Sequence, residues 1–157
     1  FLVIRDPAIK AAAAVFYAKA WEVVGARYRA SDPPAGTSRE RFDRMLAAAE
    51  YLKDHLHEAP VWIVPCLAGA RGSGGSIFPA VQNMLLACRA LGLGTTLTTV
   101  YLAHAAEAEA AMGIPEGYSS YAILPVGYPM GNFGPVRRAP LADVVYLDKW
   151  GTPFGGT

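Results

Sequence analysis

The stretch that decides the fold is Gly75 to Val100, which reads GSIFPAVQNMLLACRALGLGTTLTTV. Over residues 77–91 the apolar residues recur at the three- and four-residue spacing that lines one face of an α-helix. The opposite face is also largely apolar, and its polar breaks are Gln82, Asn83 and Arg89. A helix that is apolar on both sides must be buried on both sides. In a chain of 157 residues, we expect a second subunit to supply part of that cover.

A hydroxyl-rich segment follows this helix directly. Gly92-Leu93-Gly94 can close the helix with a left-handed residue, a conformation that glycine adopts at low cost. Residues 95–100 read TTLTTV, which is β-branched enough for a short extended segment. Four threonine hydroxyls need partners, and they suit a backbone laid against a flat, hydrogen-bonding ligand. An ordinary strand edge with satisfied hydroxyls is the alternative.

Three blocks of sequence, in the same order, resemble the nitroreductase family. Residues 76–99 are similar to the central helix and flavin-edge segment of that family. Residues 123–129 (ILPVGYP) and 135–141 (PVRRAPL) resemble its C-terminal blocks. The resemblance covers essentially the whole chain, most closely from Ala59 to Trp150. It implies an FMN-containing, homodimeric oxidoreductase with a single domain over residues 1–157.

The resemblance also implies the fold class, which is α+β. We expect a three-layer α/β/α sandwich: a central, mainly antiparallel sheet with helices on both sides, dimerising through the long buried helix. The sequence pattern by itself indicates only a layered α/β arrangement, because strand-like segments at 1–6, 59–67 and 118–126 alternate with helical patterns at 7–29, 37–56 and 103–112. Residues 131–157 have too little apolar surface to fold alone. The resemblance implies that they form an extended C-terminal arm over the other subunit.

Local signals set the expected ends of these elements. Asp6 can cap the first helix, with Pro7 in its first turn. Thr37 and Glu40 fit a capping box for the second helix. Pro65 has no N–H to donate, so we expect it at a strand end, at a bulge or on an edge.

Two further segments lie beside the central helix in sequence. Residues 68–75 hold four glycines but lack the lysine of a phosphate-binding loop, so we expect a flexible loop over a pocket. In the short helix expected at 103–112, Glu107 and Glu109 are expected to point outward.

Composition excludes several classes of protein. The net charge is +1 and charged residues make up 17%, so no basic face for nucleic acid is expected. No run reaches the roughly 18 uncharged residues that a membrane span needs. Cys66 and Cys88 are expected to be buried free thiols, which suits a reducing, cytoplasmic location. His55, His57 and His104 lack ligand spacing, so no metal site is expected.

The resemblance assigns roles to particular residues. Thr95, Thr96, Leu97 and Thr98 match the family segment whose backbone runs along the flavin ring, and Arg137 matches a phosphate-binding cation of the C-terminal arm. Phe78 is a candidate wall of the substrate pocket, with a core aromatic as the equal alternative. No side chain is expected to act as nucleophile, acid or base. NADH or NADPH would donate hydride to FMN, and a nitroaromatic, quinone or enone would accept it in a ping-pong cycle.

The chain opens inside a strand, and the family's N-terminal motif for the flavin phosphate is not among these residues. If the protein has that motif outside these residues, the site residues named above are about half of the site; if it lacks the motif, a non-catalytic binding module is favoured over cofactor binding. Two other functions remain open. One is a different flavin reaction, such as flavin fragmentation, dehalogenation or reduction of a deazaflavin precursor. The other is a non-catalytic dimeric binding module.

Overall fold

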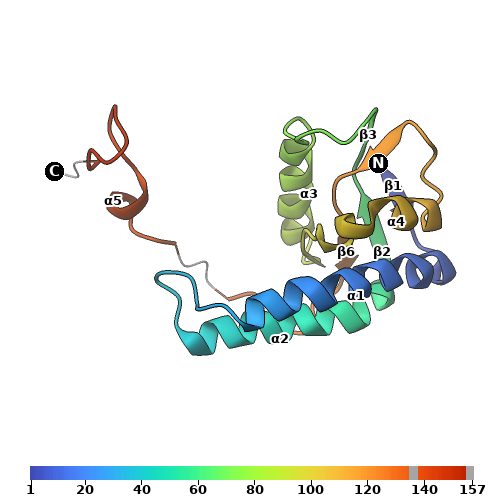
Figure 1. Cartoon of the computed structure of the whole chain (residues 1–157), viewed down its shortest axis with the longest axis horizontal. Coiled ribbons are helices and arrows are strands. Elements are labelled where there is room, and N and C mark those ends of the chain that lie inside the picture. The colour runs from blue at the N-terminus through green and yellow to red at the C-terminus, as the bar shows by residue number, and fades with distance from the viewer. Residues whose placement is uncertain (135–137, 155–157) are drawn as a thin grey trace.

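The computed structural model describes residues 1–134 and 138–154, and Figure 1 shows how their elements are arranged. Two 3₁₀ helices, η1 (Leu56–Glu58) and η2 (Val100–His104), lie between the regular elements. The helices are α1 (Pro7–Arg29), α2 (Arg39–His55), α3 (Phe78–Ala90), α4 (Ala105–Ala111) and α5 (Leu141–Val144). The strands are β1 (Leu2–Ile4), β2 (Val61–Val64), β3 (Cys66–Ala68), β4 (Gly94–Thr95), β5 (Tyr118–Ser120) and β6 (Leu124–Gly127).

The strands form an antiparallel sheet in the order β1-β2-β6-β4, and β3 pairs with β5 beyond it. Each of the strands expected at 59–67 and 118–126 is split into two. Ile63 pairs with Leu124 and Cys66 pairs with Ser120, so two residues on one side face three on the other. The extra residue lies among Tyr121, Ala122 and Ile123, where it forms a β-bulge opposite Pro65. Pro65 itself directly follows the end of β2, one of the positions expected for it. The prediction of an antiparallel α+β fold is confirmed.

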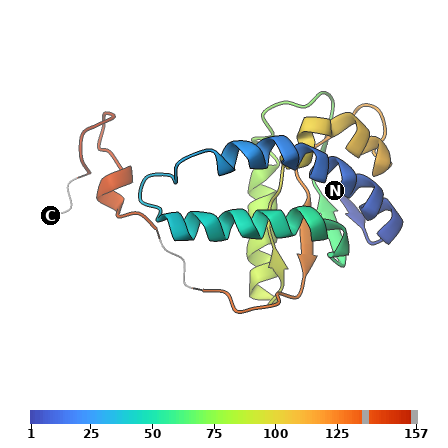
Figure 2. The same ribbon diagram turned by 60° about the horizontal axis from the view of Figure 1, so that its bottom comes forward.

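Helices cover both faces of the sheet, which confirms the three layers. Alternate residues of β2 point to opposite sides: Trp62 and Val64 belong to the core under α1, η2 and α4, and Ile63 packs toward α3. The core on the α3 side is smaller and centres on Val81 and Leu124. Helices α1 and α2 lie side by side and extend past the sheet (Figure 2).

The two long helices begin as their caps require. Asp6 caps α1, as expected, by accepting a hydrogen bond from the N–H of Ala8 at 2.8 Å. The prediction of a capping box formed by Thr37 and Glu40 is wrong, because α2 begins one residue later than that box requires. Ser38 is the cap and accepts from the N–H of Arg41 at 3.3 Å, while Glu40 pairs with Arg44 along the helix.

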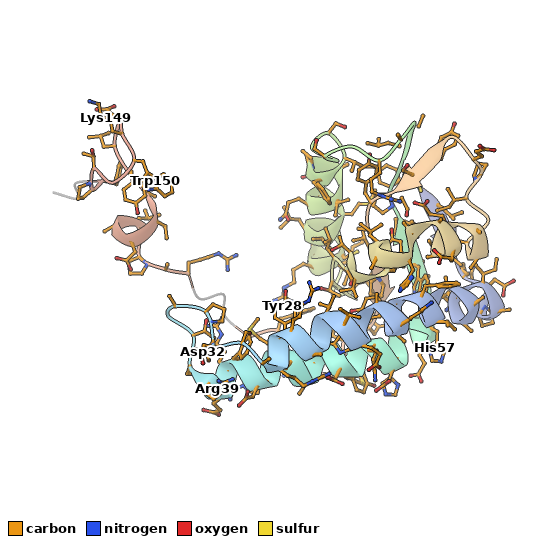
Figure 3. The ribbon with its side chains drawn as sticks, viewed as in Figure 1. Tyr28, Asp32, Arg39, His57, Lys149 and Trp150 are labelled. Atoms are coloured by element: carbon orange, nitrogen blue, oxygen red, sulfur yellow. The ribbon has the colours of Figure 1, made fainter. Side chains whose placement is uncertain are left out.

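Charged residues of the helix pair are matched with one another. Asp32 and Arg39 lie together at the loop between α1 and α2 (Figure 3), with 3.7 Å between carboxylate and guanidinium. Arg39 with Asp43 and Arg44 with Glu40 are further exposed pairs along α2, so this side of the helix is a solvated, charged face. None of the helices in the described part of the chain has the length and hydropathy of a membrane span.

Helix α3 is covered on one side within this chain. It begins at Phe78 rather than near Gly75, because Gly74 takes a positive φ of 68° and its carbonyl accepts from the N–H groups of Ile77 and Phe78. Val81 is its one buried residue, whereas Leu86 is 57% exposed and Leu91, just beyond the helix, is 74% exposed. A single chain therefore does not bury this helix on both sides.

The segment 138–154 lies apart from the body of the molecule in Figures 1 and 2. It holds α5 and a small turn in which the N–H of Leu147 donates to the carbonyl of Thr152. Its large apolar side chains are open to solvent, and Trp150 is 90% exposed (Figure 3). The single-domain organisation and the reach of this arm over another subunit stay predictions.

Gly74 tests how tightly the turn into α3 is packed. A Cβ at Gly74 would lie 2.5 Å from Tyr121, whereas one at Gly36, which has a similar φ of 76°, meets nothing within 4 Å. Left-handed strain alone costs about 1–2 kcal/mol, and overpacking adds about 1–3 kcal/mol. We expect Gly74→Ala to lose about 3 kcal/mol in urea unfolding and Gly36→Ala about 1 kcal/mol. Equal losses would contradict the packing.

Candidate functional site

A groove of about 370 Å³ lies at the end of the sheet, where β4 and β6 meet the end of α2. One wall comes from α2 and the turn after it, and the other comes from β4, β6 and the chain that follows β6. Its lining residues are Tyr51, Leu52, His55, Glu58, Ala59, Pro60, Gly94, Thr95, Thr96 and those at 125–130. The groove is mostly apolar, with proline, tyrosine and methionine side chains, which suits a flat ring better than a compact polar ligand.

Thr95 is one of the polar residues of the groove. Its Oγ1 is buried and has no hydrogen-bond partner among the described residues. A buried hydroxyl without a partner costs about 1–3 kcal/mol, so such atoms are uncommon unless a ligand or another chain satisfies them. The orphaned hydroxyl lies at the start of the segment that the sequence singled out for ligand binding.

Thr98, three residues on, is satisfied from within the chain. Its N–H donates to the carbonyl of Ile123 at 3.0 Å, and its carbonyl accepts from the N–H of Ile123 at 2.9 Å. Its side chain is hydrogen-bonded to Tyr17, although burial is the larger effect and raises the pKa of that phenol. Thr98 therefore offers neither backbone group to a ligand, whereas Thr96 and Leu97 are exposed.

The extended segment expected at 95–100 is thus shorter than predicted. Regular pairing ends at Thr95, resumes as one bridge between Thr98 and Ile123, and gives way to η2 at Val100. The register of Gly94 with Gly127 carries through to that bridge, so Thr96 and Leu97 span a gap in the ladder. Thr95 and Thr96 both line the groove, whereas Thr98 is buried and does not line it.

Phe78 does not line the groove. Phe78 packs with Val81, Ala122 and Leu124 on the α3 face of the sheet, in keeping with the core alternative. Its role as a wall of the substrate pocket stays a prediction. Arg137 lies outside the described residues.

Sequence reasoning missed the aromatic wall of the groove. The ring of Tyr51 stacks on His55, with centroids 4.0 Å apart, and His55 Nδ1 lies 3.0 Å from the carboxylate of Glu58. The spacing of these residues, four and then three apart on α2 and its end, is the signal that could have found them. Among the described residues, no three of the histidines, cysteines and carboxylates group as metal ligands would.

The expectation for Glu109 is wrong. Its side chain is 16% exposed and accepts hydrogen bonds from Arg71 and from both the N–H and the hydroxyl of Ser120. Glu107, in contrast, is exposed as expected and lies 3.8 Å from His104. The prediction failed because Arg71, the partner of Glu109, lies in the glycine-rich loop, and the local pattern of the helix gives no sign of it.

Thr95 and Thr98 form a matched pair for testing the groove. Replacing Thr95 with the isosteric valine removes an unsatisfied hydroxyl, so we expect the unfolding free energy to rise by about 1 kcal/mol without added ligand. Thr98→Val removes a bonded hydroxyl and should lower it by about 1 kcal/mol. Chemical denaturation of both variants measures this. A loss in Thr95→Val would show that its hydroxyl has a partner in the free protein.

The comparisons with known proteins agree with the sequence blocks. A model of the nitroreductase family matches residues 1–128. Over 73 residues, the chain is 40% identical to a Methanothermobacter thermautotrophicus protein that carries the provisional name NADH dehydrogenase/NAD(P)H nitroreductase. That match covers 45% of this chain and 38% of the relative, so it spans less than half of the relative's length.

Solved structures share the fold. Iodotyrosine deiodinase bound to FMN and 3-iodo-L-tyrosine superposes with a TM-score of 0.67 at 22% identity, over 94% of this chain and 74% of that one. A BluB-like flavoprotein from Clostridium difficile 630 gives 0.62 at 18% identity, over 94% and 78%. The FMN- and NADPH-dependent nitroreductase NfnB from Sphigopyxis sp. strain HMH gives 0.58 at 17%, over 95% and 79%. At these identities the likeness shows the fold alone. The family match over residues 1–128 shows more: the chain belongs to the nitroreductase family.

Proposed function

We propose that this protein is an FMN-dependent oxidoreductase that passes hydride from NADH or NADPH to a nitroaromatic, quinone or enone acceptor in a ping-pong cycle. Membership of the nitroreductase family supports an oxidoreductase of the flavoprotein type. The observation that carries the proposal to this site is the buried, unpartnered hydroxyl of Thr95, in an apolar groove beside Thr96.

The residues present fit a flavin. The Thr95 hydroxyl would bond a polar atom of the ring, the backbone of Thr96 and Leu97 would lie along its edge, and Arg137 would bind the phosphate. FMN, when bound, supplies the hydride chemistry. A backbone N–H at the ring edge stabilises the charge that grows there on reduction, by the same electrostatic effect as an oxyanion hole. Thr98 holds this segment from behind through Ile123.

A second flavin reaction is favoured by one observation. Among the solved structures cited above, the one with the highest TM-score is iodotyrosine deiodinase, whose bound ligands are FMN and an iodinated amino acid. Reductive dehalogenation of a halogenated aromatic is therefore the second candidate, with the same cofactor site. Loops rather than the sheet distinguish these reactions, so an assay must separate them.

We also propose that the protein works as a homodimer in the cytoplasm. The open side of α3 carries exposed leucines, and leaving such a surface in water is costly because apolar burial is worth about 25 cal/mol per Å². A second copy, meeting the same helix, covers it. The proposed partners of the protein are therefore a second copy of the chain, NADH or NADPH as the hydride donor, and a small-molecule acceptor.

The visible absorption spectrum of the purified protein with added FMN tests the cofactor. We expect a bound flavin band that NADH or NADPH bleaches and that an added quinone or nitroaromatic restores. Arg137→Ala should weaken FMN binding about tenfold, which is the loss of about 1.4 kcal/mol. Arg41→Ala, a charge-matched change on the exposed side of α2, should leave it unchanged. A protein that binds no FMN contradicts the proposal.

Light scattering tests the dimer. Leu86 is exposed in the single chain, so Leu86→Lys leaves the core intact while placing a charge in the proposed interface, and it should yield monomer. The control, Ala12→Lys, puts the same charge on an exposed position of α1 and should stay dimeric. A stable interface of this kind buries on the order of 2,000 Å² or more. A monomeric wild-type protein would rule out the dimer.

A further inference from the structure

A buried polar network joins three parts of the chain at Ser120. Glu109 Oε1 accepts from the Ser120 N–H and from the Ser120 hydroxyl, both at 2.6 Å, and also from the guanidinium of Arg71. Ser120 is fully buried at the end of β5, directly before the bulged residues 121–123. Its N–H goes to Glu109, and its carbonyl accepts from Arg71 Nε at 3.0 Å. The carboxylate thus satisfies groups for which the strand pairing provides no partner.

Through Tyr101, the network holds the chain that directly follows the Thr95–Thr98 segment. The Tyr101 hydroxyl donates to Ser120 Oγ at 2.7 Å, and Ser120 in turn donates to Glu109. Since an ionised carboxylate can only accept, it sets the direction of both hydroxyls in this chain. Tyr101 is fully buried in η2, and burial raises the pKa of its phenol, so the group stays a donor. It follows the Thr95–Thr98 segment by three residues.

The network also holds the glycine-rich loop that leads into α3. Besides the two contacts of Arg71, the Gly72 N–H donates to the hydroxyl of Tyr121 at 2.9 Å. Farther back, Ser119 Oγ donates to the carbonyl of Gly69 at 2.9 Å. These bonds tie residues 69–72 of the loop to β5 and to Tyr121 just after it. The expected flexibility of the loop stays a prediction.

We propose that Glu109 is a positioning residue for the ligand groove: through Ser120 and Tyr101 it fixes the end of the Thr95–Thr98 segment, and through Arg71 it ties the loop before α3 to the same point. One carboxylate, outside the groove, thereby sets the relative placement of the groove's hydroxyl-rich edge and of the helix on the other face of the sheet. The effect on FMN rests on the proposed function; the effect on the two segments does not.

Hydrogen exchange of the ligand-free protein, read in peptides over residues 69–75 and 95–101, tests the placement. Glu109→Ala removes the shared acceptor, so both peptides should exchange about tenfold faster, the scale of one lost hydrogen bond. Glu109→Gln keeps a carbonyl oxygen for Ser120 but no charge for Arg71. It should restore residues 95–101 to near the wild-type rate and leave residues 69–75 fast.

Tyr101→Phe removes the hydroxyl and keeps the ring, so it should loosen residues 95–101 alone. Glu107→Ala, two residues away on the exposed side of α4, is the matched control and should change neither peptide. If Glu109→Ala does not fold, the Gln and Phe variants still decide the matter. Residues 95–101 at the wild-type rate in Tyr101→Phe would overturn the proposal. So would equally faster exchange in α2, because that shows general destabilisation.

FMN titration of the same variants links the placement to the groove. Glu109→Ala and Tyr101→Phe should weaken FMN binding about tenfold and about threefold, while Glu107→Ala binds as the wild type does. Unchanged affinity in Glu109→Ala, despite faster exchange at residues 95–101, would overturn a role in the groove. A wild-type protein that binds no FMN overturns the proposed function instead, and the exchange rates then decide the positioning role alone.

Discussion

The missing N–H of Pro65 is the constraint on which the centre of this structure depends. The segment from Val61 to Ala68 pairs with the segment from Tyr118 to Gly127 in an antiparallel manner, but a proline in the middle of that pairing cannot donate its share. The pairing is interrupted opposite Pro65 by a bulge at residues 121–123, where the N–H of Tyr121 donates to the carbonyl of Pro65 at 2.9 Å. The backbone groups of Ser120 bond instead to Glu109 and Arg71. The interruption therefore creates the position that Glu109 and Arg71 occupy.

The bulge also determines what β4 can do. Because the register of β6 with β4 continues through the bulged residues, Ile123 is free to bridge Thr98 on its other side. This bridge anchors the far end of the hydroxyl-rich segment, and the pairing of Thr95 with Val126 anchors the near end. Thr96 and Leu97 are left between two fixed points, exposed at the sheet edge. A segment held at both ends presents its backbone to a ligand at low entropic cost.

Periodicity in the sequence was enough to find most of the fold. Asp6 and the apolar stripe after it located α1 within a residue, and the Gly92 region ended α3 where expected. The antiparallel order of the strands came from the family resemblance, since apolar runs do not reveal which way neighbouring strands run. The cap of α2 was missed by one residue, because Thr37 and Ser38 are chemically equivalent candidates.

The site was harder to read, because its partners are far apart in sequence. Spacing alone could not separate Thr95, whose hydroxyl is orphaned, from Thr98, whose backbone is used by Ile123, 25 positions later. Nor could the pattern of a short alanine-rich helix separate Glu107 from Glu109, since the arginine that pairs with Glu109 lies 38 positions away. Local pattern predicts which face a residue occupies; only the fold decides whether a polar group on that face is satisfied.

The two sides of the sheet differ in how completely a single chain buries them. The side under α1 buries Trp62, Tyr101 and Leu56 completely, and the polar side-chain atoms of Trp62 and Tyr101 are satisfied from within the chain. Trp62 Nε1, for instance, donates to the carbonyl of Leu56 at 2.9 Å. The α3 side leaves an apolar face open to solvent, and the groove at the sheet end includes Thr95, whose buried hydroxyl has no partner. The core on the α1 side is therefore built within one chain, whereas the exposed face of α3 is the part of the fold that another molecule would cover.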